Sequence, residues 1–142
     1  MSIRTGEAEW QGDLKSGKGT MKVAGGAYEG PYSFTSRFEE GAGTNPEELV
    51  AAAHAGCYSM AFSNELAKAG HTPTSVTTTA KVHLETTDAG PTVTTIDLIC
   101  AAVVPGIDDA TFQQIANGAK EGCPISRLLA AATITLDATL QA

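Results

Sequence analysis

The feature that most constrains the fold is a run of ~24 residues that can form one unbroken helix. It opens at Asn45 and Pro46, because asparagine is a good N-cap and proline a good first helical residue. Glu48 follows Asn45 at the spacing of a capping box, and the run continues to Lys68 before Gly70 can end it. Its many small residues let another backbone approach closely. That property fits packing on the chain's own sheet and also fits contact with a second subunit.

The segments on either side of this helix predict strands and shorter helices. Alternation before it predicts three or four antiparallel strands up to about residue 38, the last over Tyr32–Phe38. Two Thr/Val/Ile-rich runs after it, Val76–Glu85 and Thr92–Val104, predict a long hairpin. The remaining elements are a helix capped by Asp108 or Asp109 and reaching about Glu121, a short helix near residues 124–131, and a strand over Thr133–Leu140. This order predicts the α+β class, in a single domain over residues 1–142.

The charge balance excludes several classes of partner. With 9 basic and 16 acidic residues the net charge is −7, whereas a protein that binds nucleic acid or anionic membranes needs a basic face. No apolar run reaches the ~18 residues that a membrane span needs, and the first residues lack the apolar core of a signal peptide. We therefore expect a cytoplasmic protein that binds neither nucleic acid nor membranes.

Three cysteines, Cys57, Cys100 and Cys123, are the main candidates for chemistry. An odd, sparse set without a C-x-x-C pair indicates neither a disulfide scaffold nor a structural zinc site, so we expect no metal. Cys100 lies in an apolar strand and is expected to be an inert core thiol. Cys57 lies within the long helix, and Cys123 lies at a helix end, where the pKa of a thiol can be lowered. For these two the pattern leaves both a functional and a structural role open.

Three further polar residues are candidates, each with a plain alternative. His54 lies three residues before Cys57 on the same helix face, which permits a Cys–His dyad of the thiol-hydrolase kind, although no third group to orient the histidine is evident. The alternative is a polar helix residue near a pocket rim. Arg37 is the one charge on the polar side of its predicted strand, and it is either functional or simply solvated. For Glu48 the plain alternative is that it only caps the helix, which its spacing from Asn45 already explains.

Longer motifs point to a family. Gly43–Leu49 followed by Ala52–Ala61 strongly resembles the osmotically inducible protein C (OsmC) family, which includes the organic hydroperoxide resistance proteins. Further matches to the OsmC branch lie at Ala8–Asp13, Gly17–Thr20, Val104–Asp108 and Gly122–Ser126. The resemblance covers nearly the whole chain and is far more specific than any single motif. It implies an intertwined α+β homodimer, with antiparallel sheets wrapped around two long central helices and sites at the subunit interface.

The resemblance also implies a cysteine-based, thiol-dependent peroxidase in oxidative and osmotic stress defence. Cys57 matches the cysteine that attacks the peroxide and Cys123 the resolving cysteine, while Arg37 and Glu48 match the Arg and Glu placed around the reactive sulfur. The implied cycle reduces organic hydroperoxides, with hydrogen peroxide as a second candidate substrate. It passes through a Cys57 sulfenic acid and a Cys57–Cys123 disulfide, which an external thiol or dithiol reduces without any cofactor.

Helix geometry constrains the position of Glu48. It lies nine residues before Cys57, so the two side chains are half a turn apart in direction and about 13.5 Å apart along the axis. Glu48 should therefore not reach Cys57 of its own chain. The hypothesis that follows is a composite site to which the partner subunit contributes. Two readings from other classes remain: a redox sensor in which oxidation of Cys57 switches a partner, and the Cys57/His54 hydrolase.

Overall fold

The computed structural model describes residues Met1–Ala142, which fall into two compact units, Met1–Leu49 and Val50–Ala142. The elements confirm the α+β class: two three-stranded sheets and four helices. The expectation of a single domain stays a prediction. No helix combines the length and apolar character that crossing a membrane requires.

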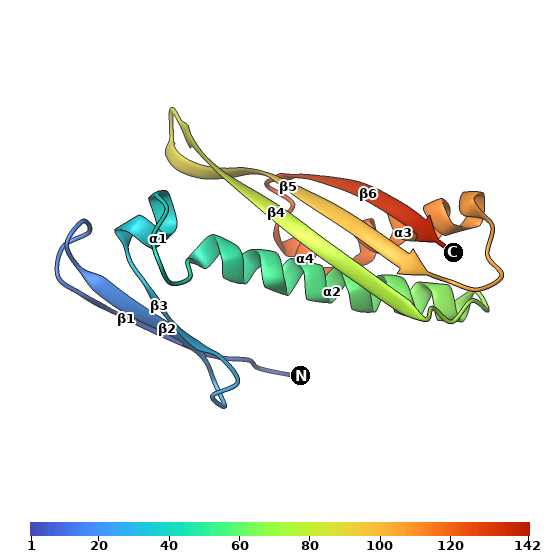
Figure 1. Cartoon of the computed structure of the whole chain (residues 1–142), viewed down its shortest axis with the longest axis horizontal. Coiled ribbons are helices and arrows are strands. Elements are labelled where there is room, and N and C mark those ends of the chain that lie inside the picture. The colour runs from blue at the N-terminus through green and yellow to red at the C-terminus, as the bar shows by residue number, and fades with distance from the viewer. The chain divides into compact units, whose positions relative to one another are not determined.

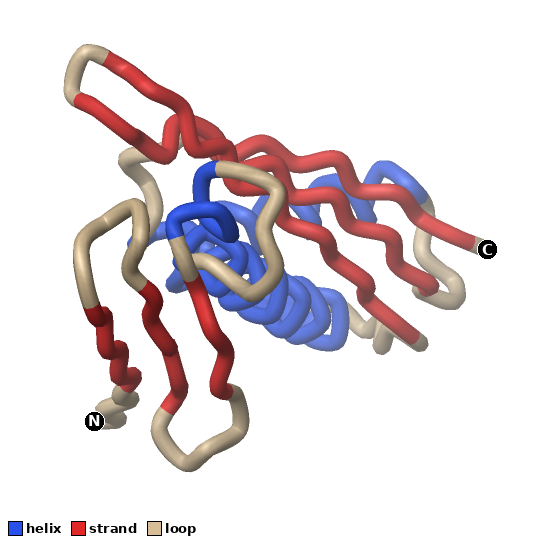
Figure 2. Tube along the Cα trace, turned by 60° about the vertical axis from the view of Figure 1, so that its left-hand side comes forward, coloured by secondary structure: helices blue, strands red, loops and turns tan.

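The N-terminal unit is built on a small antiparallel sheet in the order β1-β2-β3. Its strands are β1 (Gly6–Gln11), β2 (Lys18–Val23) and β3 (Glu29–Tyr32). The loop between β2 and β3 contains Gly25 and Gly26 with φ of 86° and 74°, a left-handed conformation that glycine adopts without strain. Figure 2 shows this loop at the free end of the hairpin.

The strand predicted over Tyr32–Phe38 is wrong beyond Tyr32. The chain instead forms a short helix, α1 (Phe34–Phe38), whose N-cap is Ser33. The Ser33 hydroxyl accepts a hydrogen bond from the Ser36 N–H, and the Ser36 hydroxyl accepts one from the Ser33 N–H, which makes a reciprocal capping box. These local bonds outweigh the alternating pattern, which by itself resembled a strand.

The long helix α2 (Pro46–Lys68) confirms the predicted helix almost to the residue. The Glu48 N–H donates to Asn45 Oδ1 at 2.8 Å, as an N-cap requires. The second half of the predicted capping box is not made, because the Glu48 carboxylate accepts a hydrogen bond from the Thr44 hydroxyl at 3.0 Å.

In the second unit α2 is followed by a sheet in the order β4-β5-β6. Strands β4 (Ser75–Thr87) and β5 (Gly90–Val103) form the predicted antiparallel hairpin. The helices α3 (Asp109–Gly122) and α4 (Pro124–Leu128) then lead to β6 (Thr133–Gln141), which pairs with β5 in parallel. The expectation of purely antiparallel sheets is therefore wrong at this pair. A helical crossover returns the chain to the same end of the sheet, which makes the next strand parallel.

The core of this unit lies between the sheet and the helices on one of its faces (Figure 1). One face of α2 carries a stripe of residues spaced by four, and each of them is fully buried. The stripe consists of His54, Tyr58, Phe62 and Leu66. Phe62 packs edge-on against Phe112 of α3, with ring centroids 5.2 Å apart, and the Tyr58 hydroxyl donates to the Ala116 carbonyl at 3.1 Å. These contacts hold α2 against α3 and determine which residues of the two helices meet.

Candidate active site

Cys57 and Cys123 meet in the second unit, although 66 residues separate them in sequence. Cys57 lies on α2, and Cys123 is shared by two helices, as the C-cap of α3 and the N-cap of α4. The Cys123 N–H donates to the Ala119 carbonyl at 2.9 Å, and Pro124 begins α4. The two Sγ atoms are hydrogen-bonded at 2.9 Å. The two cysteines that the family resemblance implied as partners are therefore in contact in the structure.

The surroundings of the pair shift the pKa values of the two thiols. Burial raises the pKa of Cys57, the hydrogen bond with Cys123 raises it further, and only the Ile125 N–H lowers it. Burial also raises the pKa of Cys123, but hydrogen bonds from Cys57, Ser126 and Ile125 outweigh that effect and bring the pKa below its ordinary value. Either sulfur can act as the donor in a thiol pair. The pKa values of the two thiols are therefore shifted in opposite directions, that of Cys57 upward and that of Cys123 downward.

The two sulfurs differ in access. Cys123 has no exposed surface, whereas Cys57 is half-buried. Cys57 lines a mostly apolar groove of about 1190 Å³ between α2 and α3, together with Met60, Ala61 and Ile115. A small molecule in this groove can therefore reach the sulfur of Cys57 but not that of Cys123.

Cys100 is confirmed as a core residue. It lies in β5 with 1% of its surface exposed, and burial raises the pKa of its thiol. A neutral, buried thiol is neither a good nucleophile nor an accessible one.

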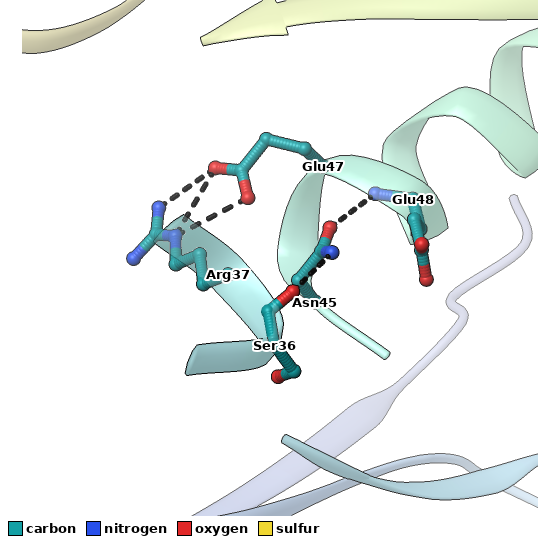
Figure 3. A network of polar contacts seen from close by, with 5 residues as sticks. All are labelled: Ser36, Arg37, Asn45, Glu47 and Glu48. Carbon is teal, nitrogen blue, oxygen red and sulfur yellow. Dashed lines mark hydrogen bonds and ion pairs between the residues drawn. The ribbon is translucent and has the colours of Figure 1, made fainter. Parts of the chain in front are cut away.

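Arg37 lies in the last turn of α1, in the N-terminal unit, and pairs with Glu47 of the same unit. Its Nη2 donates to Glu47 Oε1 at 2.8 Å, and its Nε donates to both carboxylate oxygens at 3.2 and 3.3 Å (Figure 3). The guanidinium also lies 5.2 Å from the centroid of the Phe38 ring. Arg37 is thus held by a forked ion pair on a helix, and the interpretation of a solvated strand residue is wrong.

Glu47 was not among the predicted site residues, which included its neighbour Glu48 together with Arg37. In the structure Glu48 bonds Thr44 and does not contact Arg37. Asn45 explains the choice: its side-chain amide donates to the Ser36 carbonyl at 2.9 Å and so ties the start of α2 to α1 (Figure 3). One feature of the sequence could have indicated an acidic partner for Arg37, namely the two adjacent glutamates in the first turn of α2. Which of them faces Arg37 depends on this non-local bond.

His54 does not form the dyad that its spacing allowed. Its ring is fully buried, with Nε2 2.7 Å from the Ser126 hydroxyl and Nδ1 without any hydrogen-bond partner. Neither nitrogen bonds Cys57, so the Cys57/His54 hydrolase lacks its base and the histidine near a pocket rim is also wrong. Across the chain, no three His, Cys, Asp or Glu side chains are grouped so that they could hold a metal ion.

Comparison with known proteins agrees with this geometry. The family model described as "OsmC-like protein" matches residues 39–138. The chain is 52% identical over 139 residues to "Peroxiredoxin OsmC" of Escherichia coli (strain K12), covering 97% of this chain and 96% of that protein, and a protein of the same name in Shigella flexneri matches equally.

Solved structures match the fold over almost the full length. An OsmC-like protein of unknown function from Vibrio cholerae has a TM-score of 0.78 at 20% identity, covering 98% of this chain and 100% of that one. The organic hydroperoxide resistance protein OhrB of Bacillus subtilis has a TM-score of 0.71 at 20% identity, covering 95% and 98%. The chain therefore belongs to the OsmC family and, as its peroxiredoxin relatives indicate, it is a peroxidase.

Proposed function

We propose that the protein reduces organic hydroperoxides to alcohols through a Cys57 sulfenic acid and a Cys57–Cys123 disulfide. The observation that carries this proposal is the 2.9 Å separation of the two sulfurs. A disulfide bond is about 2.05 Å long, so closing it takes a movement of about 0.9 Å.

The cycle has three steps. The Cys57 thiolate attacks one peroxide oxygen, the O–O bond breaks, and the alcohol leaves, so that Cys57 becomes a sulfenic acid. Cys123 then attacks the Cys57 sulfur and displaces the hydroxyl group, which leaves as water. Two external thiols, or one dithiol, then reduce this disulfide by exchange through a mixed disulfide and are themselves oxidised to a disulfide. Cys57 takes the peroxide because it alone of the two is accessible from the groove.

Cys57 needs a positive charge that its own unit does not supply. Within Val50–Ala142, burial raises the pKa of Cys57, so the thiolate is disfavoured. Arg37 is the family's candidate for this charge, and its ion pair with Glu47 presents the guanidinium as a fixed fork.

Deprotonation alone does not make a good peroxidase. For a thiol, lowering the pKa by about 2.5 units from its usual value raises the thiolate fraction at pH 7 about thirty-fold. The lower basicity costs about thirteen-fold in nucleophilicity, if the slope near 0.45 for thiol exchange holds for peroxides. The net gain is about two- to three-fold. We therefore assign Arg37 mainly to the charge that develops on the peroxide oxygens.

The Arg37–Glu47 pair is proposed to come from the partner subunit of a homodimer. Glu47 precedes Cys57 by ten residues of one helix, which is about 15 Å along the axis. The side of α2 that is not buried in its own unit carries Met60, which is 76% exposed, beside the apolar groove. A second copy of the chain can cover this surface and bring its arginine to the sulfur.

The apolar groove favours organic hydroperoxides over hydrogen peroxide, because an alkyl or aryl group gains free energy by leaving water. This preference agrees with the name of the Bacillus subtilis structure, an organic hydroperoxide resistance protein. The cycle needs a thiol or dithiol reductant, which places the protein in a reducing compartment such as the cytoplasm.

The proposal is tested by one equivalent of cumene hydroperoxide, followed by alkylation of the remaining thiols in denaturant, intact mass measurement and peptide mapping. We expect a Cys57–Cys123 disulfide, an alkylated Cys100 and one equivalent of released alcohol. Unmodified Cys57 would overturn the proposal. Oxidation that occurs once but is not reversed by thiols or dithiols would support the redox sensor instead.

A further inference from the structure

The N-terminal unit contains an aromatic pocket that the proposed cycle does not use. Its volume of about 410 Å³ falls within the range of ~300–1,000 Å³ that is typical of small-molecule sites. Half of the chain's aromatic residues line it, and Arg37 forms part of its wall. All of these residues belong to Met1–Leu49, so the pocket stays with the arginine wherever that unit lies. The large apolar side chains of the lining are those of Trp10, Leu14, Tyr32, Phe34 and Phe38.

The aromatic walls pack in pairs and remain open to water. The rings of Trp10 and Tyr32 have centroids 5.2 Å apart, and those of Phe34 and Phe38 have centroids 5.0 Å apart. None of these four rings is fully buried, Phe38 is 38% exposed, and Leu14 at the same pocket is 60% exposed. A ligand with an apolar group that covers these walls removes their surface from water, which favours binding.

Arg37 adds unused hydrogen-bond donors to this pocket. Its Nε and Nη2 donate to Glu47, whereas Nη1 makes no hydrogen bond within the chain (Figure 3). The guanidinium carbon lies 5.2 Å from the centroid of the Phe38 ring, so the free donors and the aromatic wall are adjacent. An occupant that satisfies both carries an oxygen acceptor attached to a compact apolar group. An organic hydroperoxide has this form.

The groove beside Cys57 differs from this pocket in its chemistry. Its lining contains no aromatic residue, and its large apolar side chains are those of Met60 and Ile115. Such walls favour apolar over polar molecules but offer no ring for an aryl group to pack against. Aromatic rings gain from edge-to-face and offset contacts with one another beyond the area that they bury. An aryl group therefore matches the aromatic pocket better than it matches the groove.

We propose that the aromatic pocket is the subsite for the organic group of the hydroperoxide, and that it gives the enzyme a preference for aryl over alkyl hydroperoxides. This inference rests on the proposed function, in which Arg37 acts on the peroxide oxygens. When these oxygens accept hydrogen bonds from Nη1, the group bonded to them enters the pocket beside the guanidinium. Phe34 and Leu14 then determine specificity, because they contact the organic group and not the reacting oxygens.

Binding can be measured without turnover, because Trp10 is the only tryptophan of the chain. Cumyl alcohol is added to a Cys57→Ser protein, and Trp10 fluorescence is excited at wavelengths that the alcohol does not absorb. The comparison ligand is tert-butanol, which carries a methyl group in place of the ring. We expect a saturable change, with an apparent Kd at least about ten-fold lower for cumyl alcohol. A change that does not saturate with cumyl alcohol, or equal Kd values for the two alcohols, would overturn the inference.

Steady-state kinetics test the specificity with cumene hydroperoxide and tert-butyl hydroperoxide, which differ by the same replacement of a ring by a methyl group. Phe34→Leu should lower kcat/KM about five-fold for cumene hydroperoxide and about two-fold or less for tert-butyl hydroperoxide. Leu14→Ala should act in the same direction, and its exposed position makes this truncation safe for the fold. The matched control is Tyr28→Leu, which removes an exposed ring of the same unit that does not line the pocket and should leave the ratio unchanged.

Three outcomes would overturn the subsite. Equal losses for the two hydroperoxides in Phe34→Leu and Leu14→Ala would show that these residues do not contact the organic group. Loss of the aryl preference in Ile115→Ala but not in Phe34→Leu would assign the organic group to the groove beside Cys57. A changed oligomeric state of both pocket variants in analytical ultracentrifugation would show that a second copy covers the pocket. If the parent forms no Cys57–Cys123 disulfide, the proposed function fails, and the fluorescence titration still decides whether the pocket binds an aryl group.

Discussion

Arg37 is held by Glu47, and the next residue, Glu48, turns to Thr44 instead. Successive side chains on a helix differ in direction by about 100°, so two adjacent glutamates do not serve the same partner. The Arg37–Glu47 pair is complete within residues 1–49, before any second subunit is considered. This pair is what we propose each chain supplies to its partner.

The two glutamates should therefore respond differently to loss of charge. Glu47→Gln is expected to lower kcat/KM for an organic hydroperoxide roughly ten-fold, because a charge-assisted hydrogen bond contributes about 1.5 kcal/mol at the low end. The low end applies because the Arg37 side chain is 36% exposed. Glu48→Gln serves as the matched control, with a change of about two-fold or less. Equal losses in the two variants would contradict the assignment.

Arg37→Lys separates the two possible roles of the arginine. Lysine keeps the positive charge that favours a thiolate but loses the planar fork that can bind two oxygens. We expect the thiolate fraction of Cys57 to be largely retained, measured by the pH dependence of alkylation, and the rate of sulfenic acid formation to fall at least ten-fold. A variant with the parental rate would show that Arg37 acts only on the pKa.

The composite site can be tested by mixing two inactive proteins. Cys57→Ser lacks the nucleophile and Arg37→Ala lacks the guanidinium, so each homodimer should be inactive. After subunit exchange, a heterodimer carries one site with both groups intact, and about half of the dimers in an equal mixture should be of this kind. Recovery of about a quarter of the parental activity is expected, and no recovery would place the arginine and the sulfur in the same chain.

Cys123→Ser isolates the resolving step. Without the second sulfur, Cys57 should still consume one equivalent of hydroperoxide and remain as a sulfenic acid. Turnover with a dithiol reductant should fall at least ten-fold, and excess peroxide should convert Cys57 to the sulfinic acid, detected by mass. Parental turnover in this variant would remove Cys123 from the cycle.

The burial of His54 predicts a loss of stability in mild acid. Because burial lowers its pKa in the folded state, the unfolded state binds the proton first as the pH falls below about 6.5. The free energy of unfolding should then fall with pH, by at most about 1.4 kcal/mol per pH unit, until the folded-state pKa is reached. Urea denaturation at pH 7.5 and 5.5 measures this loss. His54→Gln should show a smaller loss, and an equal loss would point to other groups.

Local signals made much of the fold predictable. The bounds of α2 followed from Asn45, Pro46 and Gly70, because caps act through bonds to their own neighbours. The hairpin of β4 and β5 followed from its composition and its turn for the same reason. At Ser33 two local signals disagreed: the alternation of apolar and polar residues predicted a strand, and the N-cap favoured a helix. The chain forms the helix.

Contacts between residues that are far apart in the sequence were harder to predict. That β6 is parallel to β5 depends on the path of α3 and α4, which no residue pattern encodes. The contact between Cys57 and Cys123 was expected only from the family resemblance, and the choice of Glu47 over Glu48 depends on a bond from Asn45 to Ser36. His54 could be recognised as a helix residue near Cys57, but its partner Ser126 lies 72 residues away and on another helix.

The difference in access between the two sulfurs has a consequence for side reactions in the cell. In the proposed cycle Cys123 reacts only after Cys57 has been oxidised. Before that, an accessible thiol in its place could react with a small disulfide, and the resulting mixed disulfide would stop the cycle. Cys123 has no surface open to such molecules, while the sulfur of Cys57 lies within bonding reach of it. In the proposed cycle, burial therefore shields the Cys123 thiol from glutathione disulfide, and the sulfenic acid of Cys57 is the electrophile that it meets.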